Sequence, residues 1–291
     1  MSEKLSSHVT DTISENEKFS ITPFLKWAGG KRWFVQRHAD FIPKRFNRYI
    51  EPFLGGGSVF FHLQPANSLL GDTNPDLIAA YLGIKENWGA VLKSLQYHSR
   101  QHSDEYFYLI RSSCPKDVIG RASRTIYLNR TCFNGIYRVN LRGEFNVPRG
   151  TKNSVLLDSD CFDQIAKLLE GADIRFADFE VLIDEAQTGD FIFADPPYTV
   201  RHNFNGFVKY NEKLFSWQDQ ERLAEALIRA KNRGVHILST NANHSSIREL
   251  YEDYGFNLHT TSRFSSISAS SKHRKQFDEM IISFTSGDGQ S

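Results

Sequence analysis

Short apolar runs alternate with amphipathic stretches along the chain, and the two spacings predict an α/β protein. Apolar runs of strand length cover residues 48–51, 68–72, 173–177, 190–195, 235–240 and 279–284. Helical spacing of apolar residues covers residues 88–98, 121–128, 217–232 and 246–254. Asn74 before Pro75 predicts a further helix start. The order of strand, glycine loop, helix and second strand is typical of a doubly wound, Rossmann-like sheet.

The α/β pattern is interrupted in the middle of the chain. Residues 76–160 have mostly helical spacing and end in a polar stretch rich in Asn, Gly and Arg. We therefore expect an inserted, mostly helical lobe at 76–160, between two parts of one α/β domain at 21–75 and 161–291. The polar residues 1–20 predict a flexible tail.

A glycine loop and an acid suggest a nucleoside cofactor. The loop F-L-G-G-G at 53–57 follows the first strand, and the second strand ends on Asp72. Glycines allow close backbone approach, and such an acid can accept hydrogen bonds from ribose hydroxyls. Three glycines also fit a plain turn. The full G-x-G-x-x-G spacing fails because Phe60 stands three residues after Gly57, which disfavours a dinucleotide dehydrogenase.

The motif A-D-P-P-Y at 194–198 directly follows an apolar strand, at the sheet edge where α/β proteins bind ligands. Two prolines hold an extended backbone without N–H donors, so the carbonyl groups and the Asp195 carboxylate form an edge of acceptors. Such an edge complements an exocyclic amino group, and Tyr198 offers a face on which an extruded base can stack. A strand-ending turn is the structural alternative.

A third motif, F-L-K-W-A-G-G-K at 24–31, combines a stacking surface with close approach and positive charge. Trp27 supplies the ring, two glycines follow it, and Lys26 and Lys31 supply the charge. A buried Trp beside a turn is the structural alternative.

The composition limits the function classes. Apolar residues make up 40% and charged residues 24% of 291 residues, which excludes wholesale disorder. Lys and Arg total 35 and Asp and Glu total 34, and the net charge of +1 excludes a polycation that coats nucleic acid. With no apolar run of membrane-spanning length and no signal-peptide core, we expect a cytoplasmic protein. Three cysteines without a C-x-x-C pair, and histidines without metal spacing, predict neither disulfides nor a metal site.

Basic residues concentrate in three segments despite the balanced total. Residues 121–152 contain seven basic residues and one acidic residue, and residues 26–48 contain the same numbers. Residues 263–275 contain four basic residues and no acidic residue. Their interleaving with Asn, Ser and aromatic residues favours phosphate contacts combined with reading of base edges. We expect the three segments to line one basic cleft with Asp195 at its floor.

The motifs occur in a specific order: F-L-K-W-A-G-G-K, E-P-F-L-G-G-G-S, G-D-T-N-P-D-L-I, F-N-G-I-Y-R-V-N-L-R-G-E-F-N-V-P-R-G and F-A-D-P-P-Y. Together they resemble the Dam-type (D12 class) family of DNA adenine-N6 methyltransferases, from about residue 24 to residue 284. The resemblance implies S-adenosylmethionine as cofactor, double-stranded DNA as partner and a flipped adenine as the target. It places a DNA-reading hairpin in the inserted lobe and makes GATC the expected site.

The resemblance also implies roles for single residues. It assigns cofactor binding to Trp27, Lys31, Phe53, Gly55, Gly57, Asp72 and Asp195. It assigns catalysis to Asp195, Pro196 and Tyr198. It assigns DNA binding to Lys26, Arg130, Phe133, Asn134, Ile136, Arg138 and Pro148, with a phosphate contact for Arg130.

This chain departs from the family pattern in places. Phe133 stands where some members have Tyr, which keeps an aromatic plate. R-G-T-K-N after Pro148 and T-V-R-H-N-F after Tyr198 differ from the common continuations, so the flanking DNA contacts and the loop over the target base are open.

Other activities remain alternatives. Methylation of cytosine N4 or of a protein amide uses the same chemistry, while cytosine C5 methylation is disfavoured because no Pro-Cys nucleophile is present. A DNA-binding partner that keeps its cofactor, in a restriction-modification or other defence system, is an alternative of another class. We expect a monomer of bacterial or phage origin acting on chromosomal or phage DNA.

Overall fold

The computed structural model describes most of the chain. The described residues are 21–140, 142–200, 215–264 and 276–286. The expected tail at 1–20, the loop residues 201–214 and residues 265–275 of the late basic segment lie outside the described residues.

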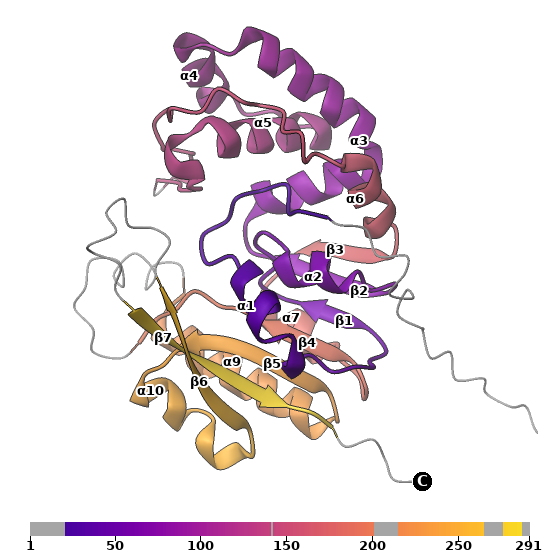
Figure 1. Ribbon diagram of the computed structural model, residues 1–291, viewed down its shortest axis with the longest axis vertical. Coiled ribbons are helices and arrows are strands. Elements are labelled where there is room, and N and C mark those ends of the chain that lie inside the picture. Colours follow the sequence, from indigo (N-terminus) through magenta and orange to yellow (C-terminus); the bar gives the residue numbers. More distant parts are fainter. Residues whose placement is uncertain (1–20, 141, 201–214, 265–275, 287–291) are drawn as a thin grey trace, which may run out of the picture. The chain divides into compact units, whose positions relative to one another are not determined.

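The described strands form a seven-stranded sheet of mixed direction (Figure 1). The strands are β1 (Tyr49–Glu51), β2 (Ser68–Asp72), β3 (Ala172–Phe176), β4 (Phe191–Ala194), β5 (His236–Ala242), β6 (Asn257–Phe264) and β7 (Gln276–Phe284). Their order is β3-β2-β1-β4-β5-β7-β6. β4 runs parallel to β1 and β5, β2 runs parallel to β3, and β7 runs antiparallel to β5 and β6. The predicted doubly wound α/β fold is confirmed, and its strand order reverses at β1 and β4.

The chain divides into two compact units. The described residues of unit 1 are 40–53, 178–200, 215–264 and 276–286, and those of unit 2 are 21–39, 54–140 and 142–177. These limits differ from the expected domain limits at 76 and 160, because α3 begins directly after β2 and keeps the insertion packed with its neighbours. The recognition domain at 76–160 therefore stays a prediction. The turn η2 (Ala39–Phe41) lies at the sequence boundary of the two units.

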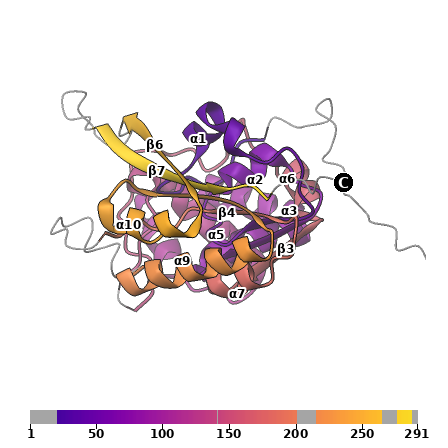
Figure 2. The same cartoon turned by 90° about the horizontal axis from the view of Figure 1, so that it is seen from below.

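In its described part, unit 1 contains four helical elements besides its strands. They are α7 (Phe179–Asp184), α9 (Trp217–Asn232), α10 (Ser245–Glu249) and η4 (Glu252–Tyr254). A reciprocal capping box between Ser216 and Asp219 starts α9, and Gly234, with a φ of 81°, follows its end. α7 and α9 lie side by side, and Arg222 and Arg229 of α9 each contact Glu180 of α7 at 2.8 Å (Figure 2). This pairing holds α9 against α7.

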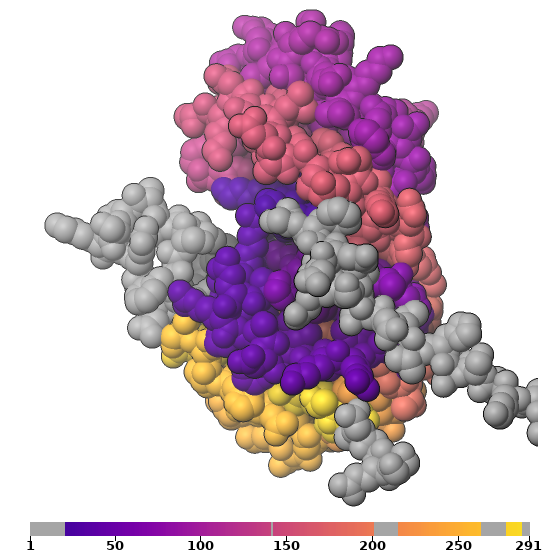
Figure 3. Space-filling view, turned by 45° about the vertical axis from the view of Figure 1, so that its right-hand side comes forward, coloured from indigo at the N-terminus to yellow at the C-terminus, as the bar shows by residue number. Residues whose placement is uncertain are grey.

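Unit 2 is dominated by helices. They are α1 (Arg32–Arg37), α2 (Ser58–Leu63), α3 (Pro75–Gln101), α4 (Asp104–Ser112), α5 (Val118–Thr131), η3 (Phe133–Gly135) and α6 (Phe162–Leu169). α5 packs closely on α3 at Gly83, where a Cβ would lie 2.4 Å from the Cβ of Ala122. The segment after α5 crosses the surface of this unit, next to the magenta surface of α3 and α4 (Figure 3). The close α3–α5 packing sets the position from which that segment starts.

Membrane spans, metal clusters and disulfides can be checked only in the described part of the chain. No helix there has the length and apolarity needed to cross a bilayer. No three His, Cys, Asp or Glu side chains gather there as metal ligands. The thiols of Cys114, Cys132 and Cys161 are free.

Candidate functional site

The glycine loop before α2 is held in shape from two sides. Gly55 has a left-handed φ of 47°, and a Cβ on it would lie 2.8 Å from Trp27 Cδ1. The hydroxyl of Tyr81 donates to the Gly55 carbonyl at 3.2 Å, and a Cβ on Gly57 would lie 2.7 Å from that hydroxyl. These positions require glycine, because the Trp27 ring and the Tyr81 hydroxyl lie too close to leave room for a Cβ.

Asp72 ends β2 beside this loop. Its carboxylate oxygens accept hydrogen bonds from the backbone N–H of Gly55 at 3.1 Å and of Asn74 at 2.9 Å. Burial raises the pKa of Asp72 to about 6, and the N–H groups of Gly55, Asn74 and Thr73 act in the opposite direction. The residue is still partly exposed. It therefore presents an oriented acceptor of the kind that binds ribose hydroxyls.

Trp27 connects the glycine loop with the segment after α5. Its ring stacks on Tyr137, with centroids 5.2 Å apart and planes at 28°. The Tyr137 hydroxyl donates to Asp76 Oδ2 at 3.0 Å, and the backbone N–H of Asp76 donates to Asn74 Oδ1 at 3.0 Å. We call the resulting closed set of contacts the aromatic circuit, and its members are Trp27, Tyr137, Asp76, Asn74, Asp72 and Gly55.

Lys31, a predicted cofactor residue, is buried. Its ammonium donates to the carbonyl of Gly29 at 3.0 Å, and Gly29 has a left-handed φ of 79°. The bond stabilises the turn of the first motif. A direct cofactor contact by Lys31 stays a prediction.

In unit 1, hydrogen bonds orient the D-P-P-Y motif at the end of β4. Thr240 Oγ1 on β5 donates to Asp195 Oδ1 at 2.7 Å. Gln220 Nε2 on α9 donates to the Pro197 carbonyl at 3.2 Å, and Asn241 Nδ2 donates to Gln220 Oε1 at 2.9 Å. The acceptor edge expected from the sequence is therefore fixed by side chains of two neighbouring elements.

The Tyr198 ring is fixed at its hydroxyl, which donates to Glu279 Oε2 on β7 at 2.8 Å. Burial, followed by the charges of Asp195 and Glu279, raises the pKa of Tyr198 well above its ordinary value. The phenol therefore keeps its proton across the physiological range. The sequence reasoning missed Thr240 and Glu279, because each partner lies on a strand distant in sequence and neither belongs to a recognisable motif.

Phe53, after β1, belongs to an aromatic cluster. Its ring stacks on Phe179 with centroids 5.3 Å apart and meets the edge of Phe215 at 5.6 Å. The Arg222 guanidinium lies 4.9 Å from the Phe179 centroid. The cluster forms an apolar wall in unit 1, and its predicted role in cofactor binding stays a prediction.

The polar stretch after α5 forms a short antiparallel hairpin. Backbone hydrogen bonds of 2.8–3.1 Å pair Thr131 with Gly150, Phe133 with Pro148, Arg138 with Asn146 and Asn140 with Glu144. Isolated bridges join Cys132 with Arg149 and Val139 with Phe145. The hairpin thus lies where the resemblance places a DNA-reading element.

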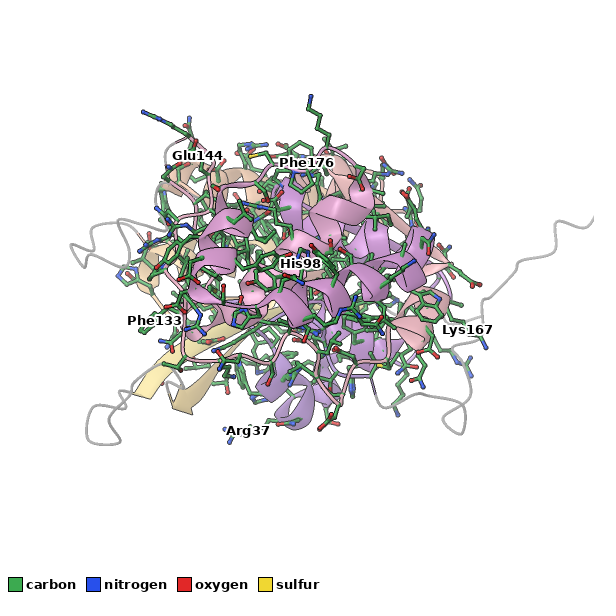
Figure 4. All side chains as sticks on the ribbon, turned by 90° about the horizontal axis from the view of Figure 1, so that it is seen from above. Arg37, His98, Phe133, Glu144, Lys167 and Phe176 are labelled. Atoms are coloured by element: carbon green, nitrogen blue, oxygen red, sulfur yellow. The ribbon has the colours of Figure 1, made fainter. Side chains whose placement is uncertain are left out.

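Several predicted DNA-contacting side chains lie on the surface of this hairpin. Phe133 is 51% exposed and Ile136 40%, which is unusual for large apolar side chains, and Phe133 lies at the outer edge in Figure 4. Arg138 and Pro148 are also exposed, and Arg138 Nε donates to Asn146 Oδ1 at 2.8 Å. Asn134 is exposed with a left-handed φ of 55°. Exposed plates beside an oriented guanidinium suit contact with stacked bases.

Lys26 fastens the first motif to the hairpin. Its backbone N–H donates to Asn129 Oδ1 at 2.9 Å, and Asn129 Nδ2 donates to its carbonyl at 2.8 Å. Its ammonium donates to the Asn134 carbonyl. Its stem lies against Gly135, where a Cβ would meet Lys26 Cδ at 2.8 Å. The hairpin therefore cannot shift without moving the residue beside Trp27.

Arg130 does not lie on the exposed face where a phosphate contact was expected. It is 7% exposed, and its terminal nitrogens contact the two Asp160 carboxylate oxygens at 2.6 Å and 2.7 Å. They also donate to the carbonyls of Val155 at 2.9 Å and Phe24 at 3.2 Å. In this arrangement Arg130 ties the return segment after the hairpin to the first motif, and its forked end is engaged inside the protein.

The predicted site residues fall into two sets. Unit 2 contains Lys26, Trp27, Lys31, Gly55, Gly57, Asp72, Arg130, Phe133, Asn134, Ile136, Arg138 and Pro148. Unit 1 contains Phe53, Asp195, Pro196 and Tyr198. The expected basic cleft involves both units and residues 263–275, and it stays a prediction.

Comparison with known proteins assigns the family. The sequence profile of the family described as "D12 class N6 adenine-specific DNA methyltransferase" matches residues 27–267. The chain belongs to this family. The resemblance drawn from the ordered motifs is thereby confirmed, and the protein is an adenine-specific DNA methyltransferase.

Curated relatives match 82–93% of the length of this methyltransferase. "Type II methyltransferase M1.LlaDCHI" of Lactococcus lactis subsp. cremoris is 34% identical over 279 residues, 93% of this chain and 98% of the relative. "DNA adenine methylase" of Vibrio cholerae serotype O1 is 32% identical over 267 residues, 90% of this chain and 95% of the relative. "Type II methyltransferase M.MjaIII" of Methanocaldococcus jannaschii is 33% identical and covers 82% of this chain and 90% of the relative.

Proposed function

We propose that the methyltransferase transfers a methyl group from S-adenosylmethionine to N6 of an adenine flipped out of a short double-stranded site, with GATC as the expected site. The observation that carries this proposal is the oriented acceptor edge after β4. Asp195 Oδ1 accepts a hydrogen bond from Thr240 Oγ1, and two prolines follow Asp195. Such an edge matches an exocyclic amino group, which is a pure donor when its lone pair is delocalised.

The residues of the glycine loop fit an adenosine-type cofactor. Asp72 is an oriented carboxylate for ribose hydroxyls, and the absence of a side chain on Gly55 lets the Trp27 ring lie directly against the loop. When bound, S-adenosylmethionine supplies an electrophilic methyl group on its sulfonium. We assign the glycine loop, Trp27 and Asp72 to holding the nucleoside part of the cofactor.

Asp195 and its neighbours prepare the nucleophile. Adenine N6 is a poor nucleophile because its lone pair is delocalised into the ring. Asp195 and the Pro196 carbonyl accept hydrogen bonds from the amino hydrogens, which localises the lone pair on nitrogen. Held in this way, N6 would attack the methyl group that the bound cofactor would supply, and the proton that N6 then releases would pass along its hydrogen bond to the Asp195 carboxylate. Tyr198, fixed through Glu279, stacks on the base, so positioning and electrostatics supply the rate enhancement without a covalent enzyme intermediate.

The hairpin supplies recognition. Arg138 can bond the edge of a guanine through its fork, and Asn134 can bond adenine or fill a vacated gap. The apolar side chains that contact base pairs or insert between them are Phe133, Ile136 and Pro148. Lys26 contacts the site from the first motif, while Arg130 acts through the packing of the hairpin because Asp160 occupies its fork.

The test is to express the chain in cells that lack adenine methylation and to map modified bases by single-molecule sequencing. N6-methyladenine at GATC is the expected result. N6-methyladenine at another sequence would overturn GATC alone, and N4-methylcytosine would overturn the assigned base. Good expression without any modified base would overturn the proposed activity and leave the DNA-binding partner as the better interpretation.

A further inference from the structure

Tyr137 stands between Ile136 and Arg138, two exposed candidates for DNA contact. Its own side chain points to the opposite side, into the protein. The backbone is extended at Ile136, with φ −82° and ψ 126°, so side chains alternate along this edge of the hairpin. Ile136 and Arg138 are exposed. The Tyr137 ring instead stacks on Trp27 and meets the edge of Phe145 at 5.6 Å. Any contact that fixes its two neighbours on DNA therefore also fixes the ring that Trp27 rests on.

We propose that Tyr137 is a positioning residue that couples DNA binding at the hairpin to cofactor binding at the glycine loop. This inference rests on the proposed function, since it takes the hairpin as the DNA-reading element and the glycine loop as the cofactor site. Neither composition nor the motif order assigns a role to Tyr137. Its role comes from the aromatic circuit, in which it is the one member that belongs to the hairpin.

Two arms lead from Tyr137 to the cofactor loop. The ring arm passes through Trp27, whose Cδ1 would lie only 2.8 Å from a Cβ on Gly55. The hydroxyl arm passes through Asp76 and Asn74 to the Asp72 carboxylate.

The hydroxyl arm is also anchored to α5. Arg121 Nη2 lies 3.3 Å and Arg124 Nη1 3.8 Å from the Asp76 carboxylate. These two arginines hold Asp76 in place, so Asp76 does not move with the Tyr137 hydroxyl. If the hairpin moves, the Tyr137 side chain therefore loses its stacking on Trp27 or its hydrogen bond to Asp76. A hairpin held in one position thus stabilises the arrangement of the cofactor loop.

The coupling must be reciprocal, because linkage requires each ligand to change the affinity of the other by the same factor. DNA bound at the hairpin orders the loop in advance, and the cofactor then binds without that ordering cost. Conversely, cofactor bound against Trp27 holds Tyr137 and presents Ile136 and Arg138 in one arrangement.

The two arms can be separated by substitution. Tyr137→Phe keeps the ring arm and removes the hydroxyl arm, whereas Tyr137→Leu removes both. The attachment of Lys26 to Asn129 remains in each variant. Tyr108→Leu is the matched control, because Tyr108 is a half-exposed tyrosine of α4 in the same unit.

The experiment measures the dissociation constant of sinefungin, a non-reactive cofactor analogue, by calorimetry. It is measured without DNA and with a saturating duplex that carries the site mapped by sequencing. For the wild type we expect the duplex to tighten sinefungin binding at least about fivefold.

In Tyr137→Leu the duplex should have almost no effect on sinefungin binding, and the dissociation constant of sinefungin without DNA should rise about threefold to tenfold. Tyr137→Phe should bind sinefungin without DNA within about twofold of wild type and show an intermediate effect of the duplex. Tyr108→Leu should match the wild type.

The outcomes separate the two proposals. If the wild type binds neither sinefungin nor the duplex, the proposed function is overturned and the coupling with it. If the wild type binds both without mutual effect, only the coupling is overturned. A Tyr137→Leu protein that melts earlier and binds both ligands more weakly, yet keeps the full effect of the duplex, shows a merely structural role and also overturns the coupling.

Discussion

Thr240 Oγ1 lies 2.7 Å from Asp195 Oδ1 and donates a hydrogen bond to it across β4 and β5. The register of the two strands causes this contact, since Ala194 pairs with Ser239 and the next residues follow in step. Thr240 is fully buried, so the bond is sheltered from water. One carboxylate oxygen is thus oriented before a substrate binds, which reduces the reorganisation needed during reaction.

Thr240→Val should therefore lower kcat about tenfold to a hundredfold, the equivalent of one hydrogen bond to a charged group. Asp195→Ala should lower it further. Single-turnover methylation with a radiolabelled methyl donor and saturating DNA measures the chemical step. Thr125→Val is the control, because Thr125 is buried in α5 and its hydroxyl has no hydrogen-bond partner in the described residues. A Thr240→Val enzyme with wild-type kcat and intact folding would show that the bond is dispensable.

The Arg130–Asp160 pair should act through stability. Both side chains are nearly buried, at 4% and 11% exposure, so Asp160→Asn or Arg130→Ala should each cost about 3–5 kcal/mol of unfolding free energy. Urea unfolding measures this cost. DNA affinity separates the two roles: releasing Arg130 from Asp160 would strengthen phosphate binding if Arg130 contacted DNA directly. We expect Asp160→Asn to weaken DNA binding instead.

Arg138→Ala should relax sequence specificity more than it lowers overall DNA affinity. A guanidinium that reads a guanine edge contributes about 1–3 kcal/mol of discrimination against the wrong base. Methylation rates on the mapped site and on its single-base variants measure the change. Arg142, which is exposed near the turn of the same hairpin, provides the control. Equal loss of rate on all sites in the Arg138→Ala enzyme would assign the side chain to phosphate rather than base contact.

Regular elements could be predicted from the sequence where local signals and burial agree. β2 matches residues 68–72 and α9 matches residues 217–232, because apolar spacing coincides with the caps Ser216 and Gly234. α4 was not predicted, since two of its large side chains, Tyr108 and Leu109, face solvent and blur the periodicity. β6 was not predicted because N-L-H-T-T-S-R-F is a polar edge strand without an apolar run.

The site was predictable only where it consists of motifs. Asp72 and Asp195 could be named as candidates because strand ends collect ligands in α/β sheets, and their roles stay predictions. The partners that orient them depend on tertiary packing: Thr240 lies 45 residues from Asp195, and Tyr137 reaches Asp76 over 61 residues. The pairing of Arg130 could not be predicted because its partner Asp160 lies 30 residues away, and charge counting cannot distinguish a paired arginine from a free one.

Cofactor affinity should depend on pH through Asp72, whose pKa is raised to about 6 by burial. Ribose hydroxyls donate to the charged carboxylate, so binding favours the deprotonated form and lowers this pKa in the complex. Affinity should therefore be full above about pH 7 and fall as the pH drops through 6, with uptake of a proton on release of the ligand. Calorimetry of sinefungin in buffers of different ionisation enthalpy measures both effects. Asp72→Asn should bind weakly at every pH and lose the step near pH 6, with circular dichroism confirming that it is folded. A step that persists in Asp72→Asn would belong to another group, and a flat wild-type profile would show that the carboxylate does not receive the hydroxyls.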